Sequence, residues 1–279
     1  MRICYAWLLV AASVALVAGC GAATGTSSTA KLTITGSSTV APLAAEIGKR
    51  FEQRRPDVLV DVQTGGSSRG VTDAQRGLAD LGAVSRSLTA EEAATGLLAF
   101  TIAHDGVCVI LNSANPVKEL SQDQLRAIYL GTVTNWKDVG GHDAPITVIN
   151  KDEGRSTLEL FLNFLKIANK DVKASAVIGD NEQGIKTVAL NPDAIGYVSI
   201  GTAEYDAKHG TAIKLLSLNG VAATVENVGN GSFPLARPLN LVSKGEPSGL
   251  LQQFLQFARS ADVHDLVKDQ YFVPVATAR

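Results

Sequence analysis

The feature that most restricts the fold of this 279-residue chain is a recurring change of pattern, from a short apolar run through small and hydroxyl residues into a helical repeat. In the first instance, residues 32–36 have a β-like composition, Ser37-Ser38-Thr39 follows, and apolar residues then recur at helical spacing through residue 54. Three later turns have the same character, at residues 65–70, 85–89 and 153–157. Strand and helix patterns that alternate in this way predict an α/β fold with a parallel sheet.

These turns also suggest a chemistry. The first backbone N–H groups of a helix have no partner inside the helix, and they lie at the positive end of its dipole, so a helix start attracts oxyanions. Serine and threonine hydroxyls add further donors. One such turn is most simply a helix cap, but four of them in one chain favour a binding site for an anion. The Ser-x-x-Gln and Ser-x-x-Glu patterns at Ser121 and Ser156 additionally predict capping boxes.

The overall charge excludes one class of partner. The formal net charge is −2, and no run of lysine or arginine occurs anywhere in the chain. A protein that grips a nucleic-acid backbone needs a basic surface, so we expect no nucleic-acid partner. The four histidines are scattered without ligand spacing, and we expect no metal site and no cofactor.

The first twenty residues predict export. Arg2 precedes an apolar run that is too short for a comfortable transmembrane helix, and Val17-Ala18-Gly19-Cys20 resembles the bacterial lipobox. We therefore expect residues 1–19 to be a lipoprotein signal peptide, Cys20 to be acylated, and residues 20–30 to be a flexible tether. This places the protein in the periplasm or at the cell surface, anchored to the membrane by lipid. The alternative is an ordinary secretory signal that is cut nearby.

Cys4 lies in the predicted signal peptide, so Cys108 is the remaining cysteine, and it belongs to the longest apolar segment after that peptide. Residues 100–111 are apolar except for His104-Asp105-Gly106 in the middle, and Cys108 lies in the second half. We expect Cys108 to be a buried small hydrophobe that forms no disulfide. A buried strand with polar residues at its centre needs a reason, because an unpartnered buried polar group costs free energy.

Several short motifs, taken together and in order, resemble those of the phosphate-binding proteins of bacterial Pst-type ABC transporters, within the periplasmic substrate-binding superfamily. The resemblance covers nearly the whole chain. The motifs that carry it are Gly36-Ser37-Ser38-Thr39-Val40-x-Pro42-Leu43, Gly65-Gly66-Ser67-Ser68-x-Gly70, Ala83-x-Ser85-Arg86, Asp105-Gly106, Ile128-Tyr129-x-Gly131-x-x-x-Asn135-Trp136, Ala194-Ile195-Gly196-Tyr197 and Phe233-Pro234-Leu235-x-Arg237-Pro238-Leu239.

The resemblance implies a two-lobed α/β fold of type II, in which two strands cross between the lobes. The crossings would be residues 100–111 and 238–242, lobe I would comprise residues 31–110 and 232–279, and lobe II residues 111–231. It further implies a monomer without enzymatic activity that closes by a hinge over one inorganic phosphate. ABC transporter permease subunits would then receive the anion.

The same resemblance implies which residues contact phosphate. They are Ser38, Thr39, Ser67, Ser156 and Thr157, and Ser85 of the third turn joins them as a candidate. Many relatives have Arg-x-x-Gly-Ser-Gly-Thr where this chain has Lys151 to Thr157. The cationic contact is therefore open between Arg155, Arg86 and Lys151.

Some relatives also have an aspartate just after the third turn, where this chain has Ser85-Arg86, which leaves Asp105 as the candidate acceptor. Phosphate near neutral pH keeps at least one proton, whereas sulfate keeps none. A buried carboxylate would accept a hydrogen bond from the first and repel the second. On this hypothesis Asp105 decides specificity, and Asp105→Asn weakens discrimination against sulfate.

Two alternatives stay open from the sequence. Residues 66–70 formally match the G-x-S-x-G pattern of serine hydrolases with Ser67 as nucleophile. A hydrolase also needs a histidine base and an acid, and His264 with Asp180 or Asp193 would be an arbitrary choice. The second alternative keeps the binding fold and changes the anion to sulfate, molybdate or an organic phosphate.

Overall fold

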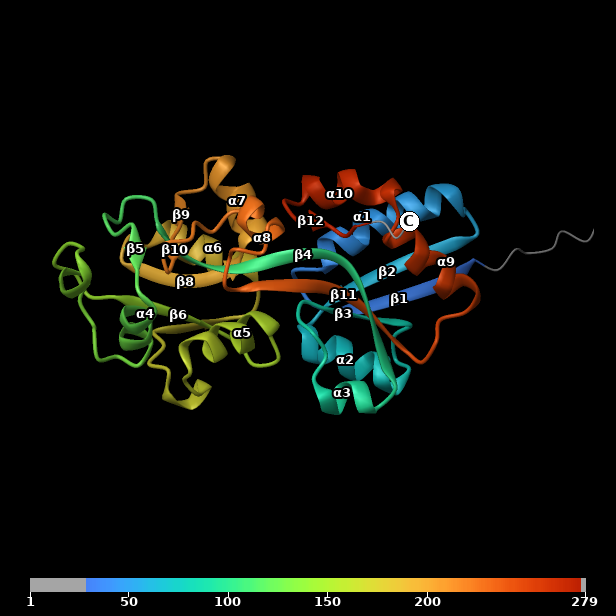
Figure 1. The fold of residues 1–279 in the computed structure, drawn as a ribbon, viewed down its shortest axis with the longest axis horizontal. Helices are drawn as coiled ribbons and strands as arrows, with labels where there is room; N and C mark the ends of the chain where they lie inside the picture. The colour runs from blue at the N-terminus through green and yellow to red at the C-terminus, as the bar shows by residue number, and fades with distance from the viewer. Residues whose placement is uncertain (1–28, 277–279) are drawn as a thin grey trace, which may run out of the picture.

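The computed structural model describes residues 29–276, which form two α/β lobes side by side (Figure 1). The predicted signal peptide, the acylated Cys20 and most of the predicted tether lie outside the described residues. Among those residues, no helix combines the length and the apolar character that crossing a membrane requires. The predicted two-lobed fold with two crossing strands is confirmed.

The first lobe contains the N-terminal strand–turn–helix units and the C-terminal helices. Its strands are β1 (Ala30–Gly36), β2 (Val58–Thr64), β3 (Leu81–Val84) and β12 (Val273–Pro274). Its helices are α1 (Ala41–Arg54), α2 (Ser67–Arg76), α3 (Ala90–Ala94), α9 (Gly249–Ala258) and α10 (His264–Asp269), with a 3₁₀ turn at Ala261–Val263. β1 pairs in parallel with β2 and β3, as the alternation of strand and helix predicts. Leu43, Ile47 and Phe51 form the buried face of α1, with the helical spacing expected of an amphipathic helix.

The second lobe has more and shorter elements. Its strands are β5 (Glu119–Leu120), β6 (Thr147–Lys151), β7 (Ala176–Ile178), β8 (Ala194–Ser199), β9 (Ile213–Leu215) and β10 (Ser217–Leu218). Its helices are α4 (Gln122–Tyr129), α5 (Ser156–Leu165), α6 (Asn181–Leu190), α7 (Ile200–Lys208) and α8 (Val225–Gly229), with 3₁₀ turns at Trp136–Val139 and Asn169–Asp171. The capping box predicted at Ser121 and Gln124 is present at the start of α4.

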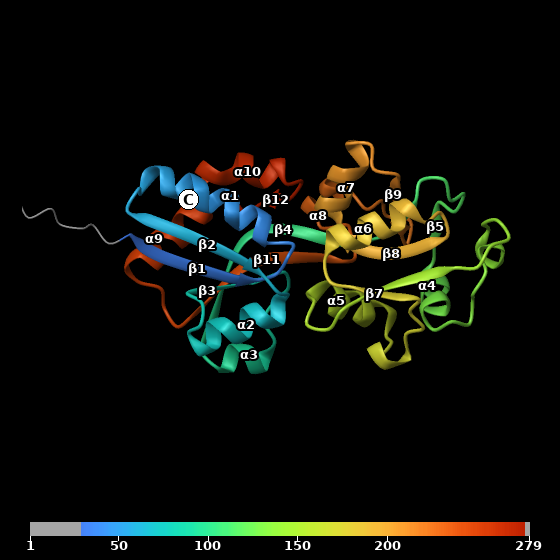
Figure 2. The same cartoon turned by 180° about the vertical axis from the view of Figure 1, so that it is seen from behind.

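Two long strands join the lobes, β4 (Leu97–Asn112) and β11 (Ala236–Lys244). They pair with each other antiparallel and run side by side from one lobe to the other, as Figure 1 and the reverse view in Figure 2 show. The sheet order is β2-β1-β3-β11-β4-β8-β6-β7. A single hydrogen-bonded path of strands therefore passes through both lobes, and these two strands carry it across.

Each lobe has its own hydrophobic core, and β4 contributes to both. Ile102 and Ala103 pack in the core of the first lobe, and residues 107–111, including the buried Cys108, pack in the core of the second. Asp105 and Gly106 lie between the two cores. The polar interruption in the apolar segment therefore falls where the chain leaves one core and enters the other.

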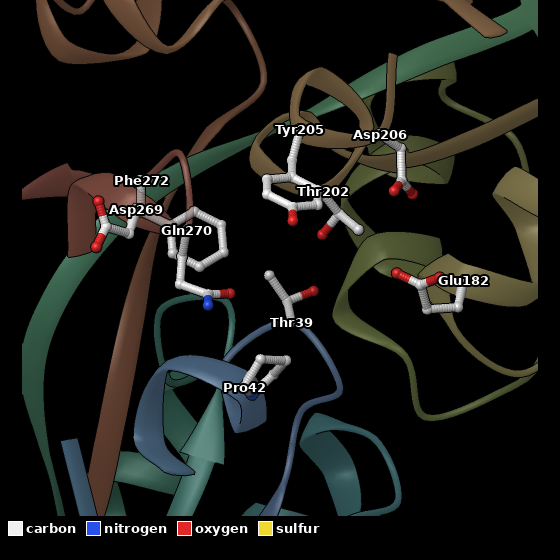
Figure 3. A pocket seen from close by; sticks show the side chains of 9 residues that line it. All are labelled: Thr39, Pro42, Glu182, Thr202, Tyr205, Asp206, Asp269, Gln270 and Phe272. Carbon is white, nitrogen blue, oxygen red and sulfur yellow. The ribbon is translucent and has the colours of Figure 1, made fainter. Parts of the chain in front are cut away.

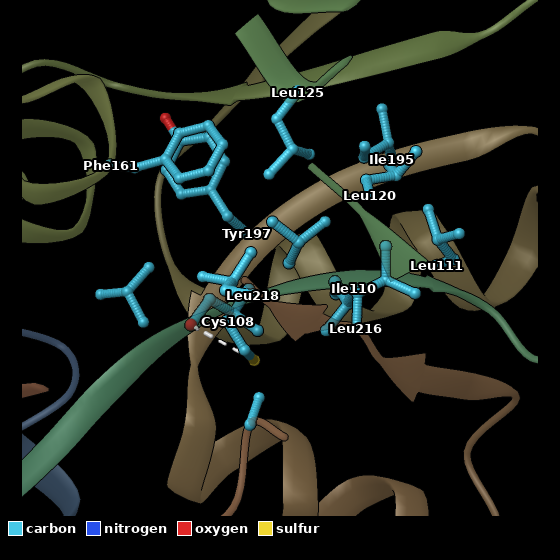
Figure 4. Packing of buried hydrophobic residues seen from close by; sticks show 14 of the residues in the cluster. Cys108, Ile110, Leu111, Leu120, Leu125, Phe161, Ile195, Tyr197, Leu216 and Leu218 are labelled. Atoms are coloured by element: carbon cyan, nitrogen blue, oxygen red, sulfur yellow. Dashed lines mark hydrogen bonds between the residues drawn. The ribbon is translucent and has the colours of Figure 1, made fainter. Parts of the chain in front are cut away.

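Aromatic packing in the second core holds α5 against the sheet. Phe161 of α5 stacks on Tyr197 of β8 with ring centroids 4.0 Å apart (Figure 4). The Tyr197 hydroxyl donates to Asn150 Oδ1 at 2.6 Å, at the end of β6. The stacked rings and the satisfied hydroxyl make this a well-defined contact. It fixes the direction of α5, whose N-terminus faces the other lobe.

Candidate anion-binding site

A small cavity lies between the lobes where α1, α2 and α5 begin, and the volume open to the centre of a water-sized sphere is about 10 Å³. This volume is well below the roughly 300–1,000 Å³ of pockets for drug-sized ligands, so it suits a small ion. The residues that line it are Ser37, Ser38, Thr39, Gly66, Ser67, Ser85, Arg155, Ser156 and Thr157.

The first turn is shaped by a glycine and a serine. Gly36 has a φ of +134°, and a Cβ there would lie 2.3 Å from the Ala83 carbonyl oxygen, so no other residue fits without movement of the backbone. Ser37 Oγ accepts hydrogen bonds from the backbone N–H groups of Thr39 at 3.2 Å and Val40 at 3.4 Å. The hydroxyl of Ser37 therefore holds the turn that leads into α1, which itself has no side-chain cap, and Ser38 and Thr39 remain for the cavity.

The two helices that face each other across the cavity start without a side-chain cap. The residue before α2 is Gly66, and the residue before α5 is Arg155, whose side chain makes no hydrogen bond to the first turn. The capping box predicted at Ser156 and Glu159 is wrong, because Ser156 is the first residue of α5 and not its N-cap, and Glu159 pairs with Arg86 of the other lobe. Two ten-residue helices therefore direct uncapped N-termini toward one small space.

Two polar atoms of the cavity wall have no partner. Arg155 Nε and Ser156 Oγ are buried and, within the described chain, make no hydrogen bond. Buried polar atoms in native proteins nearly always have a partner, since leaving one unsatisfied costs about 1–3 kcal/mol. A bound anion between α2 and α5 would satisfy both atoms.

Below the cavity lies a fully buried ion pair that contains a residue missing from the predicted site. Arg237 Nη2 and Asp105 Oδ2 are 2.8 Å apart, and their side chains are 0% and 1% exposed. Arg237 also donates to Thr39 Oγ1 at 3.2 Å, Ser85 Oγ at 3.3 Å and Thr157 Oγ1 at 3.0 Å. The crossing strand β11 thus places a guanidinium against hydroxyls from both lobes.

Asp105 does not line the cavity. Its Oδ2 accepts from Arg237 Nε and Nη2, and its Oδ1 accepts from the backbone N–H of Gly201 at 3.1 Å. Both carboxylate oxygens are therefore engaged with the protein below the hydroxyls. The structure gives Asp105 an indirect route to a ligand, through Arg237, in place of the direct acceptor role expected from sequence.

Arg86 is also directed away from the cavity. Its guanidinium donates to both oxygens of Glu92, at 2.7 and 2.8 Å, and its Nε lies 2.6 Å from Glu159 Oε2. The hydrogen bonds to Glu92 raise the pKa of Arg86. Arg86 therefore joins the lobes beside the cavity, and Arg155 is the cation in the cavity wall.

Lys151, the third candidate cation, does not line the cavity and is buried in the second lobe. It is 2% exposed, and its Nζ donates to the Asp180 carbonyl oxygen at 2.7 Å and to Asn181 Oδ1 at 3.2 Å. Burial lowers the pKa of Lys151 to about 7, and the nearby Asp180 offsets part of this effect. Its partner Asn181 donates across the cleft to Thr39 Oγ1 at 3.1 Å.

The lobes are closed over the cavity. In addition to the Asn181–Thr39 bond, the backbone N–H of Ser68 donates to the Gly154 carbonyl oxygen at 3.2 Å, which joins the start of α2 to the turn before α5. A Cβ at Gly66 would lie 2.8 Å from that same oxygen. Glycine at position 66 therefore allows the two backbones to approach.

The predicted site residues thus fall into two groups. The structure brings seven of them together around the cavity, and these are Ser38, Thr39, Ser67, Ser85, Arg155, Ser156 and Thr157. It does not bring Arg86 or Asp105 to the cavity wall. Arg237 was the missed residue, although it already stood in one of the motifs that carry the family resemblance.

A second, larger pocket between the lobes has the wrong charge for an anion. It shares Thr39 with the small cavity, and Figure 3 shows Glu182 and Asp206 on its second-lobe side and Asp269 on its first-lobe side. Burial raises the pKa of Glu182 and that of Asp206. Carboxylates on both sides would repel an anion, so the small cavity is the better candidate.

The hydrolase alternative finds no support in the surroundings of Ser67. Its Oγ accepts from the backbone N–H of Ser85 at 3.2 Å and lies 3.5 Å from Ser85 Oγ. In the part of the chain that the structure describes, no histidine hydrogen-bonds to it. A serine nucleophile needs a base within hydrogen-bond reach.

Comparison with known proteins gives a consistent result. A model of the PBP superfamily domain matches residues 21–262. The phosphate-binding protein PstS of Bacillus subtilis is 31% identical over 286 residues, which cover 96% of this chain and 92% of the relative. The phosphate-binding protein PstS of Borreliella burgdorferi is 28% identical over 254 residues, which cover 88% of this chain and 90% of the relative.

Solved structures agree with the sequence relatives. A crystal structure of a phosphate ABC transporter substrate-binding protein with bound phosphate from Clostridium perfringens superimposes with a TM-score of 0.81 at 33% identity, and covers 88% of this chain and 100% of that one. The ABC-type phosphate transport receptor from Vibrio cholerae gives a TM-score of 0.73 at 29% identity, with the same coverage.

Proposed function

This chain belongs to the Pst-type phosphate-binding proteins of the PBP superfamily, and from this premise we propose that it captures inorganic phosphate in the cavity between its lobes and delivers it to an ABC transporter permease. The relatives are named for binding and transport, and the proposal includes no catalytic step.

The observation that carries the proposal is the pair of buried, unpartnered atoms at the start of α5. Arg155 Nε and Ser156 Oγ both belong to residues that line a space the size of a small ion. A cationic donor and a hydroxyl at an uncapped helix N-terminus are suited to a tetrahedral oxyanion. A neutral ligand would leave the charge of Arg155 uncompensated.

The proposed contacts come from both lobes. Ser38, Thr39, Ser67 and Ser85 would hold the anion from the first lobe, and Arg155, Ser156 and Thr157 from the second. Burying a multiply charged anion is expensive unless several charge-assisted hydrogen bonds replace its water. Neither lobe alone supplies enough donors, so the anion stabilises the closed arrangement, and opening at the hinge strands releases it.

We also propose the location and anchoring predicted from sequence. Cleavage before Cys20 and acylation of its thiol would hold the protein at the membrane, in the periplasm or at the cell surface, where a permease could receive the anion. The proposed permease partner follows from the relatives, and the lipid anchor follows from the lipobox-like residues 17–20. Mass spectrometry of the mature protein would test the anchor directly.

Isothermal titration calorimetry of the mature protein tests the proposed ligand. We expect one phosphate to bind per chain, and glycerol phosphate to bind far more weakly because the cavity has no room for an organic group. Sulfate or molybdate binding more tightly than phosphate would overturn the proposal in favour of another oxyanion. A burst of product from an ester substrate would instead favour the hydrolase alternative.

A further inference from the structure

Arg237 has no hydrogen-bond donor left for a ligand. A guanidinium has five N–H donors. Nε and one Nη2 hydrogen are directed to Asp105 Oδ2, at 3.2 and 2.8 Å. The other Nη2 hydrogen and both Nη1 hydrogens are directed to Thr39, Ser85 and Thr157 hydroxyls. Arg237 can therefore act on an anion only through the groups that it contacts.

Two of the three hydroxyls that accept from Arg237 have their acceptor capacity filled. A hydroxyl has one donor and two acceptor sites. Thr39 Oγ1 accepts from Arg237 and from Asn181 Nδ2, and Ser85 Oγ accepts from Arg237 and from Ser37 Oγ at 3.0 Å. Each of these two hydroxyls can therefore interact with a ligand only by donating its own proton.

The Thr157 hydroxyl also favours donation, although only one of its two acceptor sites is filled. Its Oγ1 accepts from Arg237 at 3.0 Å, and among the described residues nothing accepts its proton. All three hydroxyls belong to the cavity wall. The protons of Thr39 and Thr157 are therefore available to a ligand there, and the Ser85 proton can turn between a ligand and Ser67 Oγ, which lies 3.5 Å away.

We propose that Arg237 is a positioning residue that fixes the hydroxyls of Thr39, Ser85 and Thr157 as donors, so that the cavity selects the doubly charged form of phosphate. The inference rests on the proposed function of the cavity. A donor stabilises an unprotonated anionic oxygen and opposes a P–OH group. No carboxylate of the described chain lines the cavity to accept a second proton.

Three hydroxyls of the cavity wall keep the capacity to accept a proton. Ser156 Oγ is buried without a partner, Ser67 Oγ accepts from the backbone N–H of Ser85, and Ser38 also lines the cavity. They can accept the single proton of the doubly charged anion. Each further proton on phosphate removes an unprotonated oxygen from the fixed donors and the uncapped helix N-termini, and a buried donor left without an acceptor is costly.

Other charged groups near the cavity would not produce the same pH dependence. The groups on the surrounding elements are Asp105 on β4, Arg237 on β11, Lys151 on β6, Arg155 before α5, Asp180 before α6, and the group formed by Arg86, Glu92 and Glu159. Lys151 has a pKa of about 7, and burial also lowers the pKa of His104 on β4 and raises that of Glu182 on α6. Acidification makes each of these groups more positive or less negative, so each would strengthen anion binding at low pH, which is the opposite direction.

The test is the ratio of phosphate affinities at about pH 8 and about pH 6, measured by calorimetry. For the wild-type protein we expect affinity for total phosphate to rise roughly tenfold, following the fraction of doubly charged anion. In the double variant Asp105→Asn/Arg237→Gln, which removes both charges together, the hydroxyls can turn and accept protons. Its affinity should fall at both pH values, and the ratio should drop below threefold.

The control is Arg86→Gln, which changes a partly buried arginine that contacts no cavity hydroxyl. Its ratio should stay at the wild-type value even if its affinity falls. Arg237→Lys has three donors in place of five, and it should also lower the ratio of the affinities at the two pH values. This single variant replaces the double variant in the test if the double variant does not fold. A wild-type ratio near one, or an unchanged ratio in a folded Arg237 variant, would overturn the inference. Complete absence of phosphate binding by the wild type would instead overturn the proposed function.

Discussion

Glu159 of the second lobe and Arg86 of the first lobe form an ion pair across the cleft, with Oε2 and Nε 2.6 Å apart. Arg86 is itself held by both carboxylate oxygens of Glu92 within its own lobe. The Arg86–Glu92 contact can persist in an open protein, whereas the contact with Glu159 requires closed lobes. The pair therefore stabilises the closed form specifically.

Glu159→Gln should weaken phosphate binding modestly. Glu159 is 36% exposed, so water and salt screen the pair, and partly exposed pairs contribute about 0.2–1 kcal/mol. We expect the dissociation constant to rise by at most about fivefold, and the difference from wild type to shrink at high salt. Glu46→Gln, which removes an exposed pair within one lobe, is the matched control. Equal affinities of Glu159→Gln and the control would contradict the role of the pair in closure.

Arg155→Gln should weaken phosphate binding strongly without destabilising the free protein. The Nε of Arg155 is buried without a partner, so the substitution removes a group that costs free energy when the cavity is empty. A hydrogen bond to a charged group is worth about 1.5–3 kcal/mol, which corresponds to roughly 10- to 150-fold in affinity. Calorimetry and thermal unfolding measure the two effects. Arg126→Gln in α4 is the control, and an Arg155 variant that binds as the control does would exclude Arg155 from the site.

Asp105→Asn should make the free protein less stable and make phosphate a better stabiliser. Removing one partner of a buried ion pair costs about 3–5 kcal/mol, because the charge of Arg237 is left uncompensated. A bound anion restores part of that compensation, so added phosphate should raise the melting temperature more than in the wild type. Asp57→Asn, at an exposed pair, should change little. A smaller phosphate effect together with stronger sulfate competition would support the direct acceptor role expected from sequence.

Lys151→Met should remove a pH-dependent component of stability. Burial lowers the pKa of Lys151 to about 7, whereas the unfolded chain has the ordinary lysine pKa near 10.4. Between these values the unfolded state binds more protons, so the contribution of Lys151 to stability rises with pH. We expect the wild-type free energy of unfolding, minus that of the variant, to increase from about pH 7 to about pH 10. A constant difference, as expected for the exposed Lys49→Met, would show that the Lys151 pKa is not lowered.

The fold was predictable because its signals are local. Alternating strand and helix patterns, a proline in the first turn of α1, and the capping box at Ser121 each depend on a few neighbouring residues. The crossing strand β4 was also visible, since a polar Asp105 in an apolar run marks the point between two cores. The positions of the first, second and fourth turns around one cavity followed from the family resemblance.

The parts of the site that escaped prediction depend on tertiary contacts. Arg86 follows Ser85 directly, but neighbouring residues at the end of a strand point in opposite directions, so only Ser85 lines the cavity. Ser156 forms no capping box with Glu159, because α5 begins at Ser156 itself, and Glu159 pairs with Arg86 of the other lobe. The partners of Arg237 come from positions 39, 85, 105 and 157, and no local pattern brings these together.

A crystal structure of the protein grown with phosphate would show whether the small cavity is the phosphate site. We expect one tetrahedral anion in this cavity, within hydrogen-bond distance of Arg155 Nε and Ser156 Oγ, while Asp105 remains paired with Arg237. An anion bound elsewhere, or an empty cavity at saturating phosphate, would contradict this expectation.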